Sequence, residues 1–595
     1  MKWAGFFLIC AVGAWGQIAS PRLGFVPEGF HIRTMQGIPA AGAIGAILET
    51  GRNLALITIS PRQNYILARD ADTGEVVLVT PAAGTLATTS VVAGAAANPD
   101  SIAVSPSGSS AVLWFNSTNR AQIVSGLPAA PSIREIDAGV INAWPIAVSD
   151  DGNWIAAGAF GGTGGYLFAG DGSMTTLPIG DRVIGLTFFY NRDALAIATP
   201  SQILTTDPVS AGPPVQVGSL NPESNSGDFT VVDLAVSSDN QRIVAAEGTG
   251  LTTINLATGV ASTLDCGCQF EGLFGLGGSI FRITSLGFPL ASLGSLETAS
   301  GVESGVTADS IPRGALGDTL ADQVVKLFDA GNNRILAVPM ALSTAEPLRM
   351  SPSPRRVISE AAPPALPAVT IGGLPASSGP AQQPGMTISI ASAYSVAITG
   401  TATLTLASSV GGDDQTIQFG SGGRTVSFAI PAGSTQANFS GVASVPVLTG
   451  TVAGTITITL DLMASGTDVT PTPAPAATIA LITTPAFIQT VRFGTSTAGA
   501  FTVVVTGFST TRDMATGLFH FAPSSNATLA TTDVTVSLGQ AFSLWYSNSA
   551  SNATGSEFQL TVPFTTTNGP SADVIAVTVT LTNSKGTSSA VVNSQ

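Results

Sequence analysis

The chain has 595 residues, too many for one hydrophobic core, so we expect three or four domains. Hydrophobic residues make up 44% and charged residues only 10%, a composition rich in Gly, Ser, Thr, Ala and Val that predicts an all-β protein of short strands and tight turns. The net charge of −15, from 22 Lys and Arg against 37 Asp and Glu, argues against nucleic acid as a partner.

Residues 1–16 have the pattern of a secretory signal peptide. Lys2 precedes an apolar run from Trp3 to Trp15, and small residues at Ala14 and Gly16 favour cleavage before Gln17. No later window reaches the ~18 uninterrupted apolar residues of a transmembrane helix. We therefore expect an exported protein, secreted or held at the cell envelope, with no transmembrane segment after cleavage.

A strand–turn–strand unit then recurs along the chain. Three copies are clear, at residues 102–113, 146–157 and 234–245. Each has an apolar strand, a Ser, a polar step with Gly or Asn where positive φ is needed, and a second apolar strand, which is the pattern of a β-hairpin. Weaker copies lie at 46–56, 186–197, 273–283 and 325–336.

A second marker follows some of these hairpins, and we expect it to join the third and fourth strands of each unit. It is found at Asp72-Thr-Gly-Glu75, Gly170-Asp-Gly-Ser173 and Ala257-Thr-Gly-Val260. Four strands repeated every ~40 to 50 residues are what a propeller blade needs. The sequence therefore predicts a β-propeller over residues 17–350.

The Ala103-Val-Ser-Pro-Ser-Gly108 hairpin and the Asp72-Thr-Gly-Glu75 turn resemble the repeats of bacterial lactonase-like (YVTN-type) β-propellers, over roughly residues 22–345. The resemblance implies a propeller, usually of seven blades, with six or eight as alternatives because the last copies are degenerate. Lactonase-like enzymes hold acidic, His and Arg residues in the central channel. None of those motifs is matched here, so the resemblance implies a fold and not an activity.

The C-terminal part alternates Thr or Ser with apolar residues, as in Thr401–Leu406 and Thr455–Leu460, which predicts strands buried on one face. A strand is also expected at Phe542–Tyr546. The segment from Arg424 onward, and especially the run Val504–Thr511, resembles Ig-like modules of large secreted bacterial proteins, which implies a spacer or adhesive stalk. The predicted parts are a Pro-rich linker (351–368), a first Ig-like β-sandwich (369–470), a Pro-rich hinge (471–485) and a second Ig-like β-sandwich (486–595).

Residues suited to chemistry are scarce. After leader cleavage the cysteines are Cys266 and Cys268, for which we expect a local disulfide, with two free thiols as the alternative. The two histidines, His31 and His520, are far apart, so we predict neither a metal site nor a cofactor, and no catalytic residue. Asp70–Glu75 lacks the later ligands of a calcium loop, and its expected role is a turn.

Other polar and aromatic positions are better explained by structure. Ser105 and Ser149 occupy the same place in successive hairpins, so their hydroxyls are expected to close turns. The neighbouring acids Asp150 and Asp151 are not expected to share a proton. The aromatic residues of the last domain, including Trp545, are assigned to its core rather than to a sugar platform.

These features favour a secreted or cell-surface interaction protein of the adhesion type that is not an enzyme. The propeller would present a binding face to an extracellular protein or a carbohydrate, and the sandwiches would act as spacers. The alternative is a propeller hydrolase acting on a lactone, an ester or a glycan. The shortage of His and of acidic clusters favours the first hypothesis.

Overall fold

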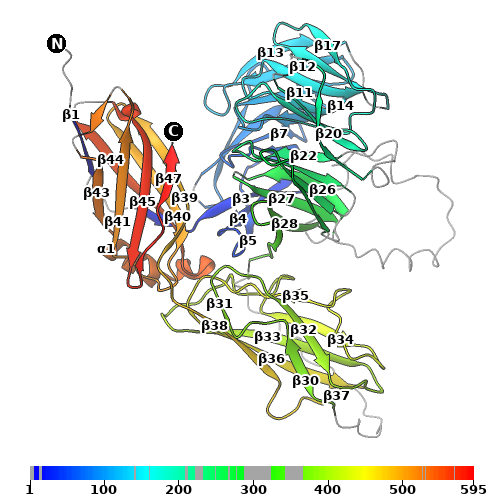
Figure 1. Ribbon diagram of the computed structural model, residues 1–595, viewed down its shortest axis with the longest axis vertical. Helices are drawn as coiled ribbons and strands as arrows, with labels where there is room; N and C mark the ends of the chain where they lie inside the picture. The colour runs from blue at the N-terminus through cyan, green and yellow to red at the C-terminus, as the bar shows by residue number, and fades with distance from the viewer. Residues whose placement is uncertain are drawn as a thin grey trace, which may run out of the picture. The chain divides into compact units, whose positions relative to one another are not determined.

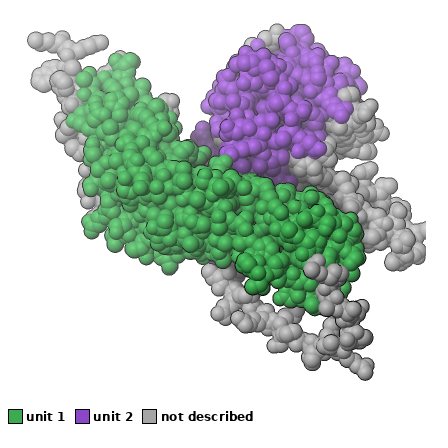
Figure 2. All heavy atoms as spheres, turned by 60° about the horizontal axis from the view of Figure 1, so that its bottom comes forward, with its two compact units in different colours: residues 1–23, 35–45, 337–595 green, residues 24–34, 46–336 purple. Residues whose placement is uncertain are grey.

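The computed structural model confirms the all-β class. It describes residues 6–11, 17–82, 84–139, 143–159, 161–207, 209, 212–221, 232–247, 250–265, 269–276, 278–286, 323–341, 366–525, 527–529, 531–567 and 570–594. The chain divides into two compact units (Figure 2). Residues 24–34 and 46–336 form the repeat unit, and residues 1–23, 35–45 and 337–595 form the module unit. No described helix is long and apolar enough to cross a membrane.

Among its described residues, the repeat unit contains six four-stranded antiparallel sheets, each made of four consecutive strands; Figure 1 shows how these strands are arranged. They are β6 (Leu54–Ile59), β7 (Ile66–Asp70), β8 (Val76–Pro81) and β9 (Ala87–Val91); β10 (Ser101–Val104), β11 (Ser110–Phe115), β12 (Arg120–Ser125) and β13 (Ser132–Asp137); β14 (Ala143–Val148), β15 (Trp154–Ala159), β16 (Gly165–Ala169) and β17 (Met174–Leu177); β18 (Gly185–Phe188), β19 (Leu195–Ala198), β20 (Gln202–Thr206) and β21 (Val215–Ser219); β22 (Asp233–Val236), β23 (Arg242–Glu247), β24 (Gly250–Asn255) and β25 (Ala261–Asp265); β26 (Gln269–Gly275), β27 (Ile280–Leu286), β28 (Gln323–Asp329) and β29 (Arg334–Ala337).

Successive sheets pack face to face, and the first strand of each sheet lies beside the first strand of the next. A separate apolar layer fills each space between sheets. Between the second and third sheets, for example, the rings of Trp114 and Phe168 meet edge to face with centroids 6.0 Å apart, beside Ile123 and Ile155. A four-stranded sheet cannot bury both of its faces alone, so this propeller-like stacking gives each sheet its core.

A further three-stranded sheet is formed by β3 (Arg22–Glu28), β4 (His31–Gln36) and β5 (Ala43–Ile47). Phe25 of β3 bonds to two sheets that are far apart in sequence. Its N–H donates to Gln63 Oε1 (3.0 Å) in the first four-stranded sheet, and its carbonyl accepts from Arg282 Nη1 in the sixth. Phe25 thereby connects the first sheet of the series to the last.

Two of the weak sequence copies were assigned wrongly. Residues 46–56 are not a hairpin, because β5 pairs with β4 while β6 pairs with β7. The hairpin of this sheet turns at Ser60–Tyr65, which repeats the Ser-Pro of Ser105-Pro106. It was missed because Arg62-Gln63-Asn64 lacks the glycine.

The copy at residues 325–336 is also not a first hairpin, because it contains most of the third and fourth strands of the sheet that begins at 269. The turn at Asp72–Glu75 joins β7 to β8, the second and third strands.

The first sandwich of the module unit has two sheets around one core that includes Ile398, Phe419 and Ile458. Its strands are β30 (Val369–Gly372), β31 (Ser377–Ser378), β32 (Gly385–Ile390), β33 (Ile398–Ser408), β34 (Thr425–Ile430), β35 (Val445–Pro446), β36 (Gly454–Ala464), β37 (Thr467–Asp468) and β38 (Ala476–Leu481). Most of the predicted linker 351–368 lies outside the described residues.

The predicted hinge at 471–485 is corrected, because β38 within it pairs with β36 and belongs to the first sandwich. The prolines at 471, 473 and 475 all precede this strand. From Ala476 onward every residue of β38 has a backbone N–H that can enter the ladder.

The second sandwich also has two sheets, with Phe501, Phe519 and Phe564 in its core. Its elements are β39 (Phe487–Thr497), β40 (Ala500–Phe508), β41 (Thr516–Pro523), β42 (Thr528–Leu529), β43 (Asp533–Ser537), α1 (Gly539–Ser547), η3 (Ser549–Thr554), β44 (Glu557–Thr567), η4 (Ser571–Asp573), β45 (Val574–Asn583), β46 (Gly586–Thr587) and β47 (Val591–Ser594). β1 (Phe6–Ala11) and β2 (Gln17–Ala19) both pair with β44. Cleavage of the leader stays a prediction.

The strand predicted at Phe542–Tyr546 is instead part of α1. Phe542 and Tyr546 are four residues apart and so share one helical face, with ring centroids 5.8 Å apart. Phe542 is fully buried against Phe558, at 4.9 Å between centroids. Burial of this face favours a helix although aromatic residues tend to form strands.

Candidate binding surface

Of the described turns between the first and second strands of the repeat-unit sheets, the four that begin with Ser60, Ser105, Ser149 and Ser237 share one hydrogen-bond pattern. The hydroxyl of their first Ser accepts the backbone N–H five residues later, at 3.2 Å for Ser105 and 2.9 Å for Ser149 and Ser237. The hydroxyls of Ser105 and Ser149 therefore close turns, as the repeat pattern predicts. We call this series of turns the turn belt; its described members are Ser60–Tyr65, Ser105–Ser110, Ser149–Trp154, Phe189–Ala194, Ser237–Arg242 and, with residue 277 left out, 276–280.

Each turn of the belt is also bonded to the next turn. The links are Tyr65 Oη to the Gly108 carbonyl (2.7 Å), Ser107 N to Asp150 Oδ1 (2.7 Å), Asn191 N to Asp150 Oδ2 (2.7 Å), Asn240 Nδ2 to the Tyr190 carbonyl (2.9 Å) and Gly278 N to Ser238 Oγ (2.9 Å). These bonds hold the sheets in register on this side of the unit.

Asp150 is the acid at the middle of this belt. It is 8% exposed, and its two oxygens accept N–H groups from the turn before it and the turn after it. Its neighbour Asp151 points elsewhere and accepts from the Ser149 hydroxyl at 2.6 Å. The two acids have separate partners, as predicted for adjacent residues in a turn.

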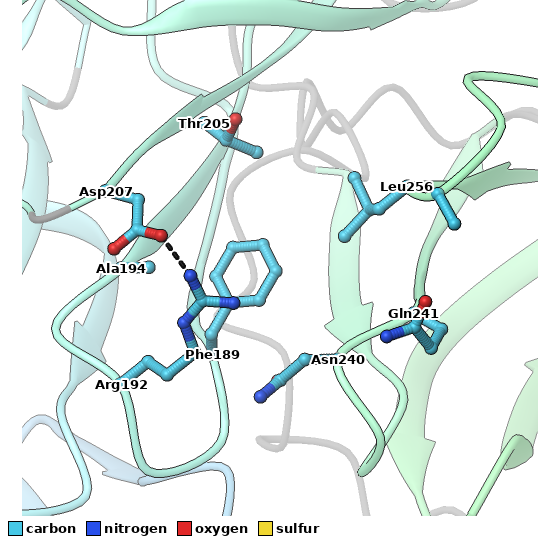
Figure 3. A pocket seen from close by; sticks show the side chains of 9 residues that line it. Phe189, Arg192, Ala194, Thr205, Asp207, Asn240, Gln241 and Leu256 are labelled. Carbon is cyan, nitrogen blue, oxygen red and sulfur yellow. Dashed lines mark hydrogen bonds and ion pairs between the residues drawn. The ribbon is translucent and has the colours of Figure 1, made fainter.

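A cleft of about 290 Å³ lies between the fourth and fifth four-stranded sheets, and we call it the lateral cleft (Figure 3). The fourth sheet supplies Phe189, Arg192, Ala194, Thr205 and Asp207, and the fifth supplies Asn240, Gln241, Leu256 and Ala257. The cleft therefore lies between two turns of the belt, Phe189–Ala194 and Ser237–Arg242, and the ends of the third strands of the same two sheets, β20 and β24.

An ion pair occupies one wall of the lateral cleft. Arg192 Nη2 binds Asp207 Oδ2, and both side chains are 50% exposed (Figure 3). The guanidinium also lies over the ring of Phe189, 6.0 Å from its centroid. An exposed pair of this kind contributes about 0–1 kcal/mol, so a ligand with suitable polar groups can replace either partner at little cost.

The opposite wall of the lateral cleft is uncharged. Asn240 has positive φ (56°), and its side-chain amide is committed to the backbone of Tyr190, accepting at 2.9 Å and donating at 2.9 Å. Gln241 and Leu256 add an amide and an apolar contact beside it. The cleft thus combines both charges, hydrogen-bonding groups and apolar surface in one small space.

A second cleft, of about 440 Å³, lies between the third and fourth sheets. Its walls are mainly apolar and include Trp154, Leu177, Pro178, Val209 and Pro214. It has no charged side chain among the residues that line it. The lateral cleft is therefore the better candidate for selective binding.

The other sequence-predicted positions give no second site. Cys266 and Cys268 lie outside the described residues. Asp70 accepts the N–H groups of Asp72 and Thr73, as expected of a turn, and its bond to Arg52 holds the pKa of its carboxyl below the usual value. Across the described part of the chain, no three His, Cys, Asp or Glu side chains gather as metal ligands would.

The residues of the lateral cleft were not predicted from the sequence. Arg192 and Asn191 stand in the Phe189–Ala194 turn, where the Ser and Gly of the clear copies are replaced. Asp207 follows a third strand and matches no motif. The available signal was that exposed residues of this turn differ from those of the clear copies. A residue needed only to form the turn would match the other copies, so a difference indicates another role.

Comparison with known proteins gives no family for this chain. No model of a protein family matches it, and no curated protein matches it. Among solved structures it is similar to a nidogen/laminin complex (11% identity, 40% of this chain and 92% of the other, TM-score 0.29). It is also similar to a functionally unknown protein from Desulfotomaculum acetoxidans (15%, 44% and 89%, TM-score 0.33) and to Kuenenia stuttgartiensis hydrazine synthase (13%, 40% and 64%, TM-score 0.27).

Proposed function

We propose that the repeat unit is a closed β-propeller of seven blades, in which residues 24–34, which carry most of β3 and β4, stand between the first and sixth four-stranded sheets. The bonds from Phe25 to Gln63 and to Arg282 support closure, because they lead from one strand to both ends of the series. A ring leaves no unpaired face at either end, and it keeps only short sheet edges.

The function that this arrangement supports best is binding of an extracellular protein or carbohydrate by an exported interaction protein. The lateral cleft carries this proposal, because it places an exposed Arg192–Asp207 pair, amide groups and apolar side chains around one opening. The sandwiches of the module unit, which are Ig-like in strand pattern, act as a spacer. The hydrolase hypothesis gains no support, since His31 and His520 belong to different compact units.

The binding role can be tested with the full chain on protein and glycan arrays, followed by affinity measurement for any ligand found. Replacing both Arg192 and Asp207 by Ala should weaken that binding by about tenfold or more, as loss of two charged contacts does. The matched control replaces Arg120 and Glu135, an ion pair of the second sheet that is 57% and 42% exposed. An equal loss in both double variants, or none in either, would contradict a role for the cleft.

A further inference from the structure

The Arg192–Asp207 pair of the lateral cleft leaves most of its bonding capacity unused. Within the described ranges, Arg192 makes one ion pair, to Asp207, and the Asp207 carboxylate accepts from no other group. A guanidinium carries several N–H donors and a carboxylate accepts several hydrogen bonds, and both side chains are 50% exposed. Each of them can therefore bind a second charged group without giving up the first.

The charges that line the lateral cleft are balanced. Arg192 and Asp207 are the charged members of the lining residues, and one cancels the other. Asp239, in the belt turn of the opposite wall, is committed to the Ser237 hydroxyl and to the N–H of Gln241. A ligand with a single charge would bind one member of the pair and lie beside the like charge of the other, which repels it. A ligand that carries both charges binds both members, so the cleft favours a zwitterion.

The contact between Arg192 and Asp207 limits how far apart the two charges of the ligand can be. The two side chains touch, so the positions open to a bound anion and to a bound cation adjoin one another (Figure 3). In an α-amino acid the carboxylate and the ammonium group are attached to the same carbon, which meets this condition. In a molecule with the two groups at opposite ends of an extended chain, only one of them can reach the pair.

Apolar side chains on both walls of the lateral cleft offer contacts to the rest of such a ligand. Phe189 is 5% exposed, and its ring lies under the Arg192 guanidinium, whose carbon is 6.0 Å from the ring centroid. Leu256 lies on the other wall (Figure 3). The cleft volume of about 290 Å³ is at the small end of the range for ligand pockets, which suits a ligand the size of one amino acid.

We propose that the lateral cleft binds a free α-amino acid with an apolar side chain. Its carboxylate bonds to Arg192, its ammonium group bonds to Asp207, and its side chain packs between Phe189 and Leu256. The inference rests on the proposed function only in taking the lateral cleft as a ligand site. Because the amino acid uses the same ion pair as the protein or carbohydrate ligand, the two ligands compete.

The test is calorimetric titration of the full chain with leucine and three probes of similar size. Isocaproate is leucine without its ammonium group, and isoamylamine is leucine without its carboxylate. The third probe, ε-aminocaproate, is an isomer of leucine with its two charges at opposite ends. We expect leucine to bind at least about tenfold more tightly than each probe, because each loses one charge-assisted contact.

Two single variants assign the charges. Arg192→Ala should make leucine bind no better than isoamylamine, since the contact to the carboxylate is gone. Asp207→Asn should make leucine bind no better than isocaproate. Isocaproate itself should bind this variant about three- to tenfold more tightly than the natural protein, because Arg192 then has no anionic partner. A gain of this kind cannot come from misfolding. Arg120→Ala, from the exposed ion pair of the second sheet, is the matched control and should leave every affinity unchanged.

Equal binding of leucine and ε-aminocaproate, no binding of leucine, or an unchanged isocaproate affinity in Asp207→Asn would overturn the proposal. The array ligand separates this inference from the proposed function. If that ligand depends on Arg192 and Asp207 while leucine shows no preference over the probes, this inference fails and the proposed function stands. If leucine binds as described and the double variant keeps the array ligand, the proposed function fails instead. When both ligands bind through the pair, excess leucine should displace the array ligand, and failure to do so would contradict a shared site.

Discussion

Glu557 in β44 is a buried acid within the module unit. It is 0% exposed, and both of its carboxylate oxygens lack a hydrogen-bond partner in the described structure. Burial, followed by the charge of Asp414, raises its pKa well above the usual value, and the nearby amide of Ile38 opposes this only in part. Glu557 therefore keeps its proton in the folded protein at pH values where the unfolded chain has lost it.

This difference makes the stability of the module unit pH-dependent. Because the folded-state pKa of Glu557 is raised, the contribution of this residue to stability is fully present below the unfolded pKa, about 4.3. That contribution is lost as the pH rises toward the folded-state pKa. The amide in Glu557→Gln does not titrate, so its contribution to stability does not change with pH. We expect the free energy of unfolding of this variant, relative to that of the natural protein, to rise by about 1–3 kcal/mol between pH 4 and pH 8.

Urea unfolding at pH 4 and pH 8 measures this gain. Glu135→Gln is the control, since Glu135 is an exposed acid of the repeat unit and should give the same difference at both pH values. A free-energy difference between Glu557→Gln and the natural protein that does not change with pH would show that Glu557 is ionised in the folded state.

The turn belt is the element that positions Arg192 and Asn240 of the lateral cleft, and Asp150 is its central acceptor. Asp150→Ala leaves the buried N–H of Ser107 and that of Asn191 without partners. We expect a loss of about 2–4 kcal/mol from two unsatisfied donors, and a fall of several degrees in the melting temperature. Asp171→Ala, in an exposed turn of the same unit, should cost far less.

Thermal unfolding followed by calorimetry compares these two variants directly. The same measurement should place Asp150→Asn between Asp150→Ala and the natural protein, because its amide keeps one acceptor oxygen. An Asp150→Ala variant as stable as Asp171→Ala would mean that the belt does not hold the sheets together.

The sequence predicted most strands but not all of their connections. Hairpins with Ser and Gly at fixed places were found because the turn itself demands those residues, as Gly108 (φ 75°) and Gly152 (φ 69°) show. The β6–β7 turn was missed because Gln63 takes the positive φ (55°) there instead of a glycine. α1 was missed because its helical form depends on burial of Phe542 against Phe558, a contact that no local pattern encodes.

The candidate sites were beyond sequence reasoning for a related reason. Arg192 and Asp207 are 15 residues apart, and the spacing between them reflects a strand and a turn rather than any motif. Their meeting follows from the fold of one sheet and not from the pattern within one repeat.

At the scale of the whole molecule, the repeat unit and the module unit bury the apolar faces of their sheets in two different ways. With only 10% charged residues, the chain covers its strands with Ser, Thr and Gly and buries alternating apolar side chains. The sandwiches do so by pairing two sheets around one core. The repeat unit instead stacks small sheets in series, so both ends of that series need a neighbour.

Closure of the series through Phe25 is the central claim, and a distance between its two ends tests it most directly. Spin labels at Arg62→Cys and Ser279→Cys, with the native cysteines Cys10, Cys266 and Cys268 replaced by Ser, report on the first and sixth sheets. With sheets packed about 10 Å apart, a ring closed by residues 24–34 predicts a label separation below about 30 Å. A distribution centred near 50 Å or beyond, as an open stack of six sheets requires, would contradict the closed propeller.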